Sequence, residues 1–299
     1  MDTTIIDVSR AIAVILLTAV ASSCGQPSNA KLIDRLQHSE RFEVRVAAAR
    51  TLGERKAAEA VQPLIRSLDK DIAPVRLSVV GALRRIKDPR ALEPLIQLLN
   101  DSNYLVQAEA ARVLGEMKDA RAIEPLISAL RRSNPEAGPA LAGIGNAAIA
   151  PLVRSLRDSD LRLGASDTLE KIGLPAVDAL CDTVRTDSGE ARIAAAKVLA
   201  GIDDPRVAQT FDPILNDSDL WLAAAAYKFL LRQHTPASND LLIKVMRTYG
   251  NMRMATDFFN SPSPVLRRAA ENWANQNNYS IDVLTNLAAT DSRSRSRAR

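Results

Sequence analysis

A repeat of thirty-one residues is the feature that most constrains how this chain can fold. Residues 44–68 read "VRVAAARTLGERKAAEAVQPLIRSL", and the next two periods read "VRLSVVGALRRIKDPRALEPLIQLL" and "VQAEAARVLGEMKDARAIEPLISAL". The same residue types return in three columns: Val44, Val75 and Val106; Leu52, Leu83 and Leu114; Pro63, Pro94 and Pro125. A period of this length with helical patterning is typical of a solenoid, whose units bury their apolar faces against each other.

Each repeat predicts two helices. The "EPLIQLL" segment places Leu and Ile at helical spacing, and the "VRxxAAxxL" segment carries alanines where a neighbouring unit must approach closely. Ala and Leu, the best helix formers, are abundant, while aromatic residues make up only 4% of the chain. No segment has a convincing strand pattern. We therefore predict an all-α fold, a right-handed α-solenoid of about eight helix pairs over residues 29–290.

Turn residues predict where the pairs begin and end. In "KDPRALEP" and "DDPRVAQ", Asp88 and Asp204 are expected to be N-caps, with Pro89 and Pro205 at the first helical position. The fourth pair should be shortened around "SNPEAGPALAGIG", and the eighth should be interrupted by "NMRMATDFFNSPSP", before a final helix near residues 280–289. The predicted pairs are 29–54, 57–87, 89–118, 120–145, 147–173, 175–203, 205–233 and 238–275.

The repeated signature resembles a known family. A Pro-Leu helix, an acidic turn, a "VR..A...L" helix and a Gly-containing joint are similar to the HEAT-like repeats first described in phycobilisome lyases. Residues 75–99 carry it best, with "IGNAAIAPLVRSLRDSD" and "IGLPAVDALCDTV" further on, and the resemblance extends over about residues 29–250. It implies the solenoid fold but not a function, because such arrays serve many unrelated roles. No residue here matches the active surface of the lyases.

The first residues resemble a secretory signal. An apolar run covers residues 11–20, and small residues lead from it to Cys24. The run is shorter than the roughly 20 residues that span a bilayer, but it fits the apolar region of a signal peptide. Small residues that end in a cysteine resemble the lipobox of bacterial lipoproteins. This resemblance implies a signal peptide over residues 1–23, lipidation of Cys24, a tether over residues 24–28, and a protein anchored to a membrane of the cell envelope, facing the periplasm or the exterior.

An alternative interpretation of this segment remains open. Asp2 and Asp7 outnumber Arg10 where a positive charge is expected, and Ala21 stands where a lipobox usually has Leu. The segment could instead be an apolar N-terminal helix that packs on the first repeat, with Cys24 incidental. The protein would then be cytoplasmic.

The net charge of +4 lies in the last residues of the chain. "SRSRSRAR" at residues 292–299 holds four of the 39 Lys and Arg, which leaves 35 against 35 Asp and Glu. We predict a disordered basic tail over residues 291–299, with phosphate or anionic-lipid binding as its alternative role. DNA glycosylases built on similar repeats need a basic concave face with aromatic side chains. The neutral body therefore makes nucleic acid an improbable partner.

Motifs of catalysis and metal binding are missing from the sequence. His38 and His234 are the only histidines, and neither belongs to an HExxH motif. No GxSxG, P-loop or GxGxxG motif occurs. The deoxyhypusine hydroxylases, which have similar repeats, bind two irons through His-Glu pairs that this chain lacks. We predict no catalytic, cofactor or metal residue and no enzyme activity; Cys181 should be a small buried side chain.

Two sets of residues are candidates for partner binding. The column two positions before the recurring Leu reads Arg50, Gly81, Arg112, Asp167, Lys197 and Lys228, which is mostly basic. It would suit an acidic partner, although such a column is more often a solvated helix face. Nine of the eleven aromatic residues follow residue 210. Most should fill the core, but Phe258 and Phe259 are predicted to lie in a loop, where aromatic residues can anchor a partner.

Together these patterns predict a non-catalytic scaffold that binds another protein or peptide along its concave face at the cell envelope. The alternative is a cytoplasmic maturation factor of the phycobilin-lyase type. A second set of arginines, at the position after the recurring Val, is assigned to stability. Arg45, Arg76, Arg162 and Arg192 should pair with acidic turn residues such as Asp71, Asp158 and Asp187.

Overall fold

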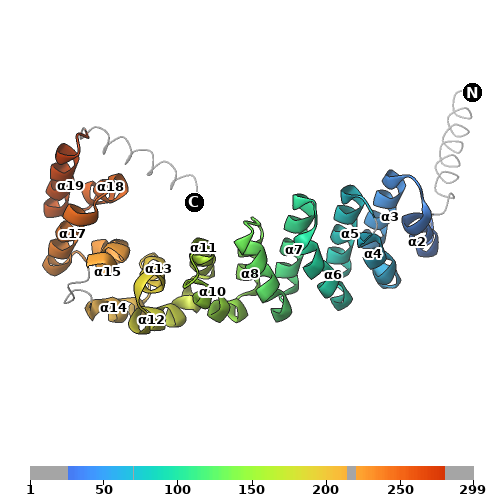
Figure 1. Ribbon diagram of the computed structural model, residues 1–299, viewed down its shortest axis with the longest axis horizontal. Coiled ribbons are helices and arrows are strands. Elements are labelled where there is room, and N and C mark those ends of the chain that lie inside the picture. The colour runs from blue at the N-terminus through green and yellow to red at the C-terminus, as the bar shows by residue number, and fades with distance from the viewer. Residues whose placement is uncertain (1–25, 70, 214–219, 280–299) are drawn as a thin grey trace, which may run out of the picture. The chain divides into compact units, whose positions relative to one another are not determined.

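The computed structural model describes residues 26–69, 71–213 and 220–279, and within these ranges it contains helices and no strand (Figure 1). The helices divide into two compact units, residues 1–110 and residues 111–299, and the division falls inside α7 (Tyr104–Met117). The all-α prediction is confirmed. The helix bounds of the first six predicted pairs agree with the repeat pattern to within a few residues.

The first unit consists of successive helix pairs in which each second helix packs on the next. Contacts join α2 to α3, α3 to α5, and α4 to α5, and Figure 1 shows α3 and α5 side by side. The recurring Leu52, Leu83 and Val75 are buried, as the repeat predicts. The elements of this unit are α2 (Asn29–His38), α3 (Phe42–Glu54), η1 (Ala58–Ala60), α4 (Val61–Leu68), α5 (Ala73–Ile86), η2 (Pro89–Ala91), α6 (Leu92–Gln97) and η3 (Leu98–Asn100).

Alanine and glycine let the second helices approach closely. A Cβ atom built on Gly53 in α3 would lie only 2.6 Å from the Cα atom of Ala82 in α5. In the second unit, a Cβ atom on Gly115 would lie 2.6 Å from the Cα atom of Ala140. Gly53 and Gly115 each follow the recurring Leu of their repeat. Each of them contacts the alanine that precedes the recurring Leu of the next repeat. No side chain larger than hydrogen fits at Gly53 or Gly115 without a shift of the neighbouring helix.

The second unit continues the pattern with shorter and less regular helices. The fourth pair is shortened as predicted, because α9 has 8 residues where α5 has 14. The elements are η4 (Ala120–Ala122), α8 (Ile123–Arg131), α9 (Ala137–Ile144), η5 (Asn146–Ala148), α10 (Ile149–Ser155), α11 (Arg162–Ile172), η6 (Leu174–Ala176), α12 (Val177–Thr186), α13 (Gly189–Leu199), α14 (Pro205–Phe211), α15 (Leu220–Ala225), α16 (Tyr227–Gln233), α17 (Pro236–Tyr249), α18 (Met252–Phe259) and α19 (Pro264–Gln276).

Aspartates cap the first helices of several pairs. The side chains of Asp88 and Asp204 accept hydrogen bonds from the backbone N–H two residues later, with proline at the next position, as predicted. Asp119 forms the same cap. Each carboxylate also accepts a hydrogen bond from the arginine two residues later, which is Arg90, Arg121 or Arg206. The distance from the arginine Nη2 to the aspartate Oδ2 is 2.7–2.8 Å. The cap and the ion pair together fix the joint between consecutive pairs.

The predicted arginine pairs are partly confirmed. Arg45 binds both carboxylate oxygens of Asp71 at 2.8 Å, and Arg76 binds Asp101 at 2.7 Å. Nη1 of Arg162 lies 3.9 Å from Oε2 of Glu190 in the next repeat. The Nε atoms of Arg162 and Arg192 donate to the carbonyl oxygens of Leu156 and Val184 at 2.9 Å. These carbonyls close the preceding first helix, where a basic side chain is favourable. Two of the acidic residues form ion pairs with other arginines: Asp158 with Arg131, and Asp187 with Arg157.

Candidate partner-binding groove

The residues of the predicted basic column lie on helices of both units. Arg50 is exposed on α3 in the first unit, and Lys197 and Lys228 are exposed on α13 and α16 in the second. Arg112 on α7 is half-buried and bound to Glu116 at 2.8 Å. The structure brings Lys197 together with Asp167, the acidic member of the column, at a groove between α11 and α13.

The aromatic candidates occupy a helix rather than a loop. Residues 252–259 form α18, and Phe258 inside it is fully buried. The prediction of a loop is wrong because Asn251 caps the helix by accepting from the Met254 N–H. Phe259 is half-buried, with the Arg267 guanidinium carbon 5.9 Å from its ring centroid. Phe258 is therefore inaccessible to a partner, and Phe259 exposes only part of its ring.

Most aromatic residues of the second unit contact each other. Phe211 and Phe229 meet edge to face with centroids 4.9 Å apart, and Trp273 stacks on Tyr279 at 5.7 Å. The Tyr227 hydroxyl donates to Asp257 at 2.8 Å, and burial, together with this carboxylate, raises the pKa of Tyr227. The prediction that the rings mainly fill the core is confirmed only in part, because Phe211, Phe229 and Phe258 are buried while Trp221 and Tyr279 are exposed.

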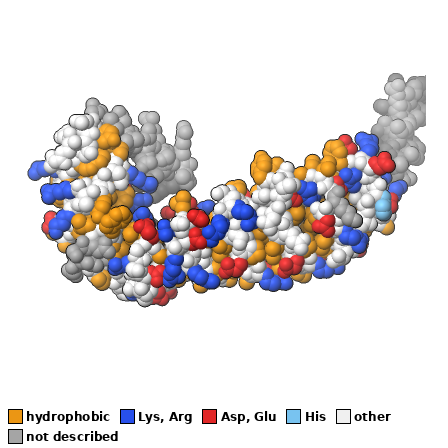
Figure 2. Space-filling model, viewed as in Figure 1, with side chains coloured by type: hydrophobic (Ala, Val, Ile, Leu, Met, Phe, Trp, Pro, Cys, Tyr) orange, Lys and Arg blue, Asp and Glu red, His pale blue; other side chains and the backbone are white. Residues whose placement is uncertain are grey.

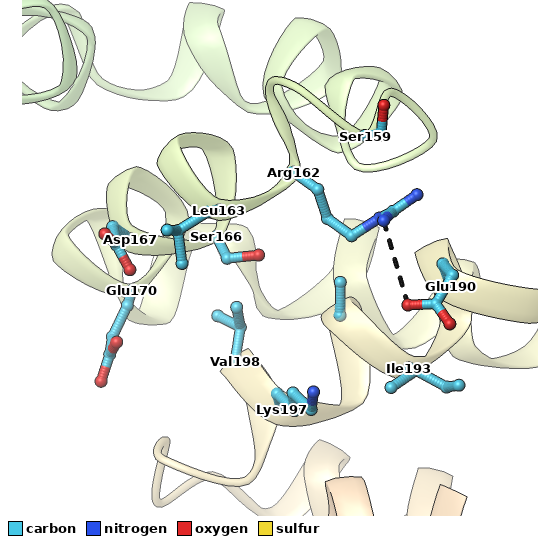
Figure 3. Close-up of a pocket in the computed structure, with 11 residues that line it drawn as sticks. Ser159, Arg162, Leu163, Ser166, Asp167, Glu170, Glu190, Ile193, Lys197 and Val198 are labelled. Atoms are coloured by element: carbon cyan, nitrogen blue, oxygen red, sulfur yellow. Dashed lines mark ion pairs between the residues drawn. The ribbon is translucent and has the colours of Figure 1, made fainter. Parts of the chain in front are cut away.

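The α11–α13 groove, which we define by Arg162, Leu163, Ser166, Asp167, Glu170, Glu190, Ile193 and Lys197, is open to solvent. Its cavity measures about 360 Å³. Leu163 is 74% exposed, and Figure 3 shows its side chain beside Ser166 on α11, across from Val198 and Lys197 on α13. An apolar side chain this exposed at the mouth of a cavity is an anchor point for a partner side chain.

Charges of both signs surround the apolar floor of the groove. Arg162 spans the opening toward Glu190, with Nη1 3.9 Å from Oε2 (Figure 3). Asp167 and Glu170 project from α11 at the far end, and Lys197 projects from α13. Figure 2 shows the same mixture of acidic and basic side chains over this part of the surface. A partner would be held in register by complementary charges rather than by a single-sign field.

Leu163, Ile193 and Glu190 line the groove, although no sequence pattern singles them out. Leu163 occupies the position after the recurring Arg, where the earlier repeats have Val46 and Leu77. Those two side chains are half-buried, whereas Leu163 is exposed. No pattern in the sequence separates the three, since all are aliphatic.

Within the described residues, no group of three His, Cys, Asp or Glu side chains could hold a metal ion. Cys181 is buried, as expected. None of the described helices is both long and apolar enough to cross a bilayer. Cys24, the signal peptide, the final predicted helix and the basic tail lie outside the described residues.

Comparison with known families finds HEAT repeats in the first half of the chain. The sequence pattern of HEAT repeats matches residues 29–104 and 92–139. No curated protein matches the chain. Among solved structures, the complex of CpcE and CpcF of phycocyanin lyase from Nostoc sp. PCC7120 is similar at 22% identity and a TM-score of 0.42, over 76% of this chain and 97% of that one.

Two further structures are similar. One is an engineered protein, at 19% identity and a TM-score of 0.31 over 87% of this chain and 98% of that one. The other is human deoxyhypusine hydroxylase in complex with glycerol, at 17% identity and a TM-score of 0.34 over 83% and 94%. At these values the similarity carries no argument about activity. The chain is an all-helical α-solenoid that contains HEAT repeats.

Proposed function

We propose that this protein is a non-catalytic scaffold that binds a segment of another polypeptide, and that the α11–α13 groove is its docking site. The observation that carries the proposal is Leu163, exposed at the mouth of a cavity whose rim carries charges of both signs. The partner segment would place one apolar side chain against Leu163 and Ile193. An acidic residue beside it would face Lys197, and a basic residue would face Glu170.

Attachment to a membrane is the second part of the proposal. Cys24 would carry the lipid after removal of residues 1–23, and the polar residues that follow would tether the repeats to the cell envelope. What supports it is the apolar run and the "ASSC" sequence. The scaffold would then hold its partner close to the membrane surface.

Site-specific photo-crosslinking tests the docking site. A photoreactive residue at Leu163 should capture a discrete partner in cells that produce the protein. The matched control is Leu174, which is also an exposed leucine, at 57%, but lies on η6 outside the groove. The proposal would be contradicted if both positions captured the same partner equally well, or if Leu163 captured no partner.

Intact-mass analysis and membrane fractionation test the anchor. The full-length protein should lose residues 1–23, gain an acyl mass on Cys24 and sediment with membranes, and Cys24→Ala should abolish all three. A soluble chain that starts at Met1 would refute the anchor and support the cytoplasmic alternative.

A further inference from the structure

A second groove lies between α17 (Pro236–Tyr249) and α19 (Pro264–Gln276) of the second unit. The two helices pack on each other near the C-terminal end of the described residues (Figure 1). The cavity measures about 240 Å³, which is less than the roughly 300 Å³ at which sites for drug-sized ligands begin. It therefore has room for a single amino-acid residue or a group of similar size.

Helical spacing gives this groove an apolar wall. Val265, Ala269 and Trp273 follow each other at four-residue spacing on α19, so they share one face of the helix. Ile243 and Met246 line the groove from α17. Val265 is 52% exposed, and Ala269 and Trp273 are half-buried. The wall can therefore cover an apolar side chain of a ligand.

Two arginines supply the charge of the groove. Arg247 lines it from α17 and Arg268 from α19, and both side chains are exposed. None of the described residues that line the groove is acidic, and neither guanidinium forms an ion pair or hydrogen bond with another described residue. Elsewhere in this unit, Arg157 and Arg206 bind carboxylates at 2.8–2.9 Å. Arg247 and Arg268 are thus available to a carboxylate that a ligand brings, which a guanidinium can bind through two parallel hydrogen bonds.

Amide side chains extend the polar side of the groove. Asn272 and Gln276 continue the row of Arg268 along α19 at four-residue spacing, and both line the groove. A carboxamide both donates and accepts hydrogen bonds, so it can pair with either polar group of a peptide bond. The row therefore fits a carboxylate that belongs to a polypeptide better than an isolated anion.

We propose that the α17–α19 groove binds the C-terminal carboxylate of a polypeptide whose last residue is apolar. The carboxylate would pair with Arg247 and Arg268, and the last side chain would lie on Val265, Ala269 and Trp273. A free phosphate or sulfate would use the arginines but leave the apolar wall uncovered, and a bilayer surface is too broad to enter so small a cavity. The inference goes beyond the proposed function, since it assigns a second site on which binding at the α11–α13 groove does not depend.

The indole N–H resonances of the two tryptophans test this site in the full chain. Trp273 lines the groove, whereas Trp221 lies on α15 outside it, and Trp221→Phe assigns the two signals. The probe is the peptide acetyl-Gly-Ser-Gly-Leu with a free C-terminal carboxylate. It should shift the Trp273 signal in a saturable manner and leave the Trp221 signal in place. The C-terminal amide of this peptide should bind at least tenfold more weakly, and so should acetyl-Gly-Ser-Gly-Ser with a free carboxylate.

Substitutions separate the two arginines from positive charge in general. Arg247→Gln combined with Arg268→Gln should weaken binding of the leucine peptide at least tenfold. The matched control is Lys244→Gln, which removes an exposed cation of α17 that does not line the groove and should leave the affinity unchanged. Both arginines are exposed, so circular dichroism should show the same helix content in the double variant as in the wild type.

Three results would overturn the proposal: no shift of the Trp273 signal with the leucine peptide, equal affinity for its acid and amide forms, or unchanged affinity in the double variant. Vesicles of phosphatidylcholine and phosphatidylglycerol provide a fourth test. If they shifted the Trp273 signal and the peptide did not, the groove would be a site for anionic membranes instead. None of these results bears on capture of a partner at Leu163, so failure here leaves the proposed function intact.

Discussion

Buried ion pairs link the turn of one repeat to the second helix of the one before it. The side chains of Arg76 and Asp101 are only 14% and 5% exposed, and their N and O atoms are 2.7 Å apart. Asp101 also accepts from the backbone N–H of Asn103 at 2.7 Å. The carboxylate therefore holds both the arginine and the turn that leads into α7 (Tyr104–Met117).

Asp101→Asn should lower the free energy of unfolding by about 3 kcal/mol, because it leaves the Arg76 charge buried without its partner. Urea unfolding measures this change. The control is Asp160→Asn, which removes the second and more distant partner of Arg131, at 3.4 Å, where the Asp160 side chain is 70% exposed. An exposed pair should contribute less than about 1 kcal/mol. Similar losses in both variants would show that burial of the pair is unimportant.

The capping aspartates predict how stability depends on pH. The guanidinium and the backbone N–H two residues on hold the pKa of Asp88, Asp119 and Asp204 at about 2, below the ordinary value of 3.8. A carboxylate with a lowered pKa stabilises the fold above its unfolded pKa, and this contribution is lost as pH falls through the folded value. The loss should therefore occur between about pH 4 and pH 2.

Replacement of all three aspartates with asparagine should remove this dependence. The difference in melting temperature between the wild type and the triple variant should be full at pH 5 and shrink toward pH 2. Thermal denaturation at several pH values measures it. A difference that stays constant from pH 5 to pH 2 would mean that these carboxylates do not stabilise the joints.

At the scale of helices, close packing depends on glycine at a few positions only. Gly53→Ala should cost about 1–3 kcal/mol, because the added methyl group meets the Ala82 backbone and α3 must move. Gly81→Ala is the matched control: its Cβ atom would lie 3.7 Å from Arg85 Nη1, in ordinary contact. Alanine should there raise the free energy of unfolding by about 0.5–1 kcal/mol through helix propensity. Chemical denaturation of both variants decides the sign at each site.

How far the sequence predicts the helices depends on how regular the repeat is. The columns of Val75 and Leu83 locate the helices of the first unit because each apolar position has the same neighbours in every period. The helix α18 was not predicted, because the Asn, Pro and Ser residues around it are typical of a loop. The N-cap hydrogen bond of Asn251 is evident only from the structure. The α11–α13 groove was not predicted, because the exposure of Leu163 depends on how the neighbouring side chains pack.

At the scale of the whole molecule, the described helices that pack most extensively on each other are close neighbours along the chain. Stability in such arrays is approximately a sum of terms for single repeats and for adjacent pairs. Gly53→Ala should therefore speed hydrogen exchange in α3 and α5 while leaving α17, α18 and α19 at the wild-type rate. Exchange mass spectrometry measures all five helices in one experiment. Uniform acceleration along the chain would indicate a single cooperative unit instead.

Titration calorimetry tests most directly whether the α11–α13 groove binds a segment of another polypeptide. The segment captured by crosslinking at Leu163 would be synthesised as a peptide and titrated against the wild type, Leu163→Asp and Leu174→Asp. Leu163→Asp should weaken binding at least tenfold, about 1.4 kcal/mol, while Leu174→Asp should leave the affinity unchanged. Equal affinity of the peptide for all three proteins would show that it does not bind at the α11–α13 groove.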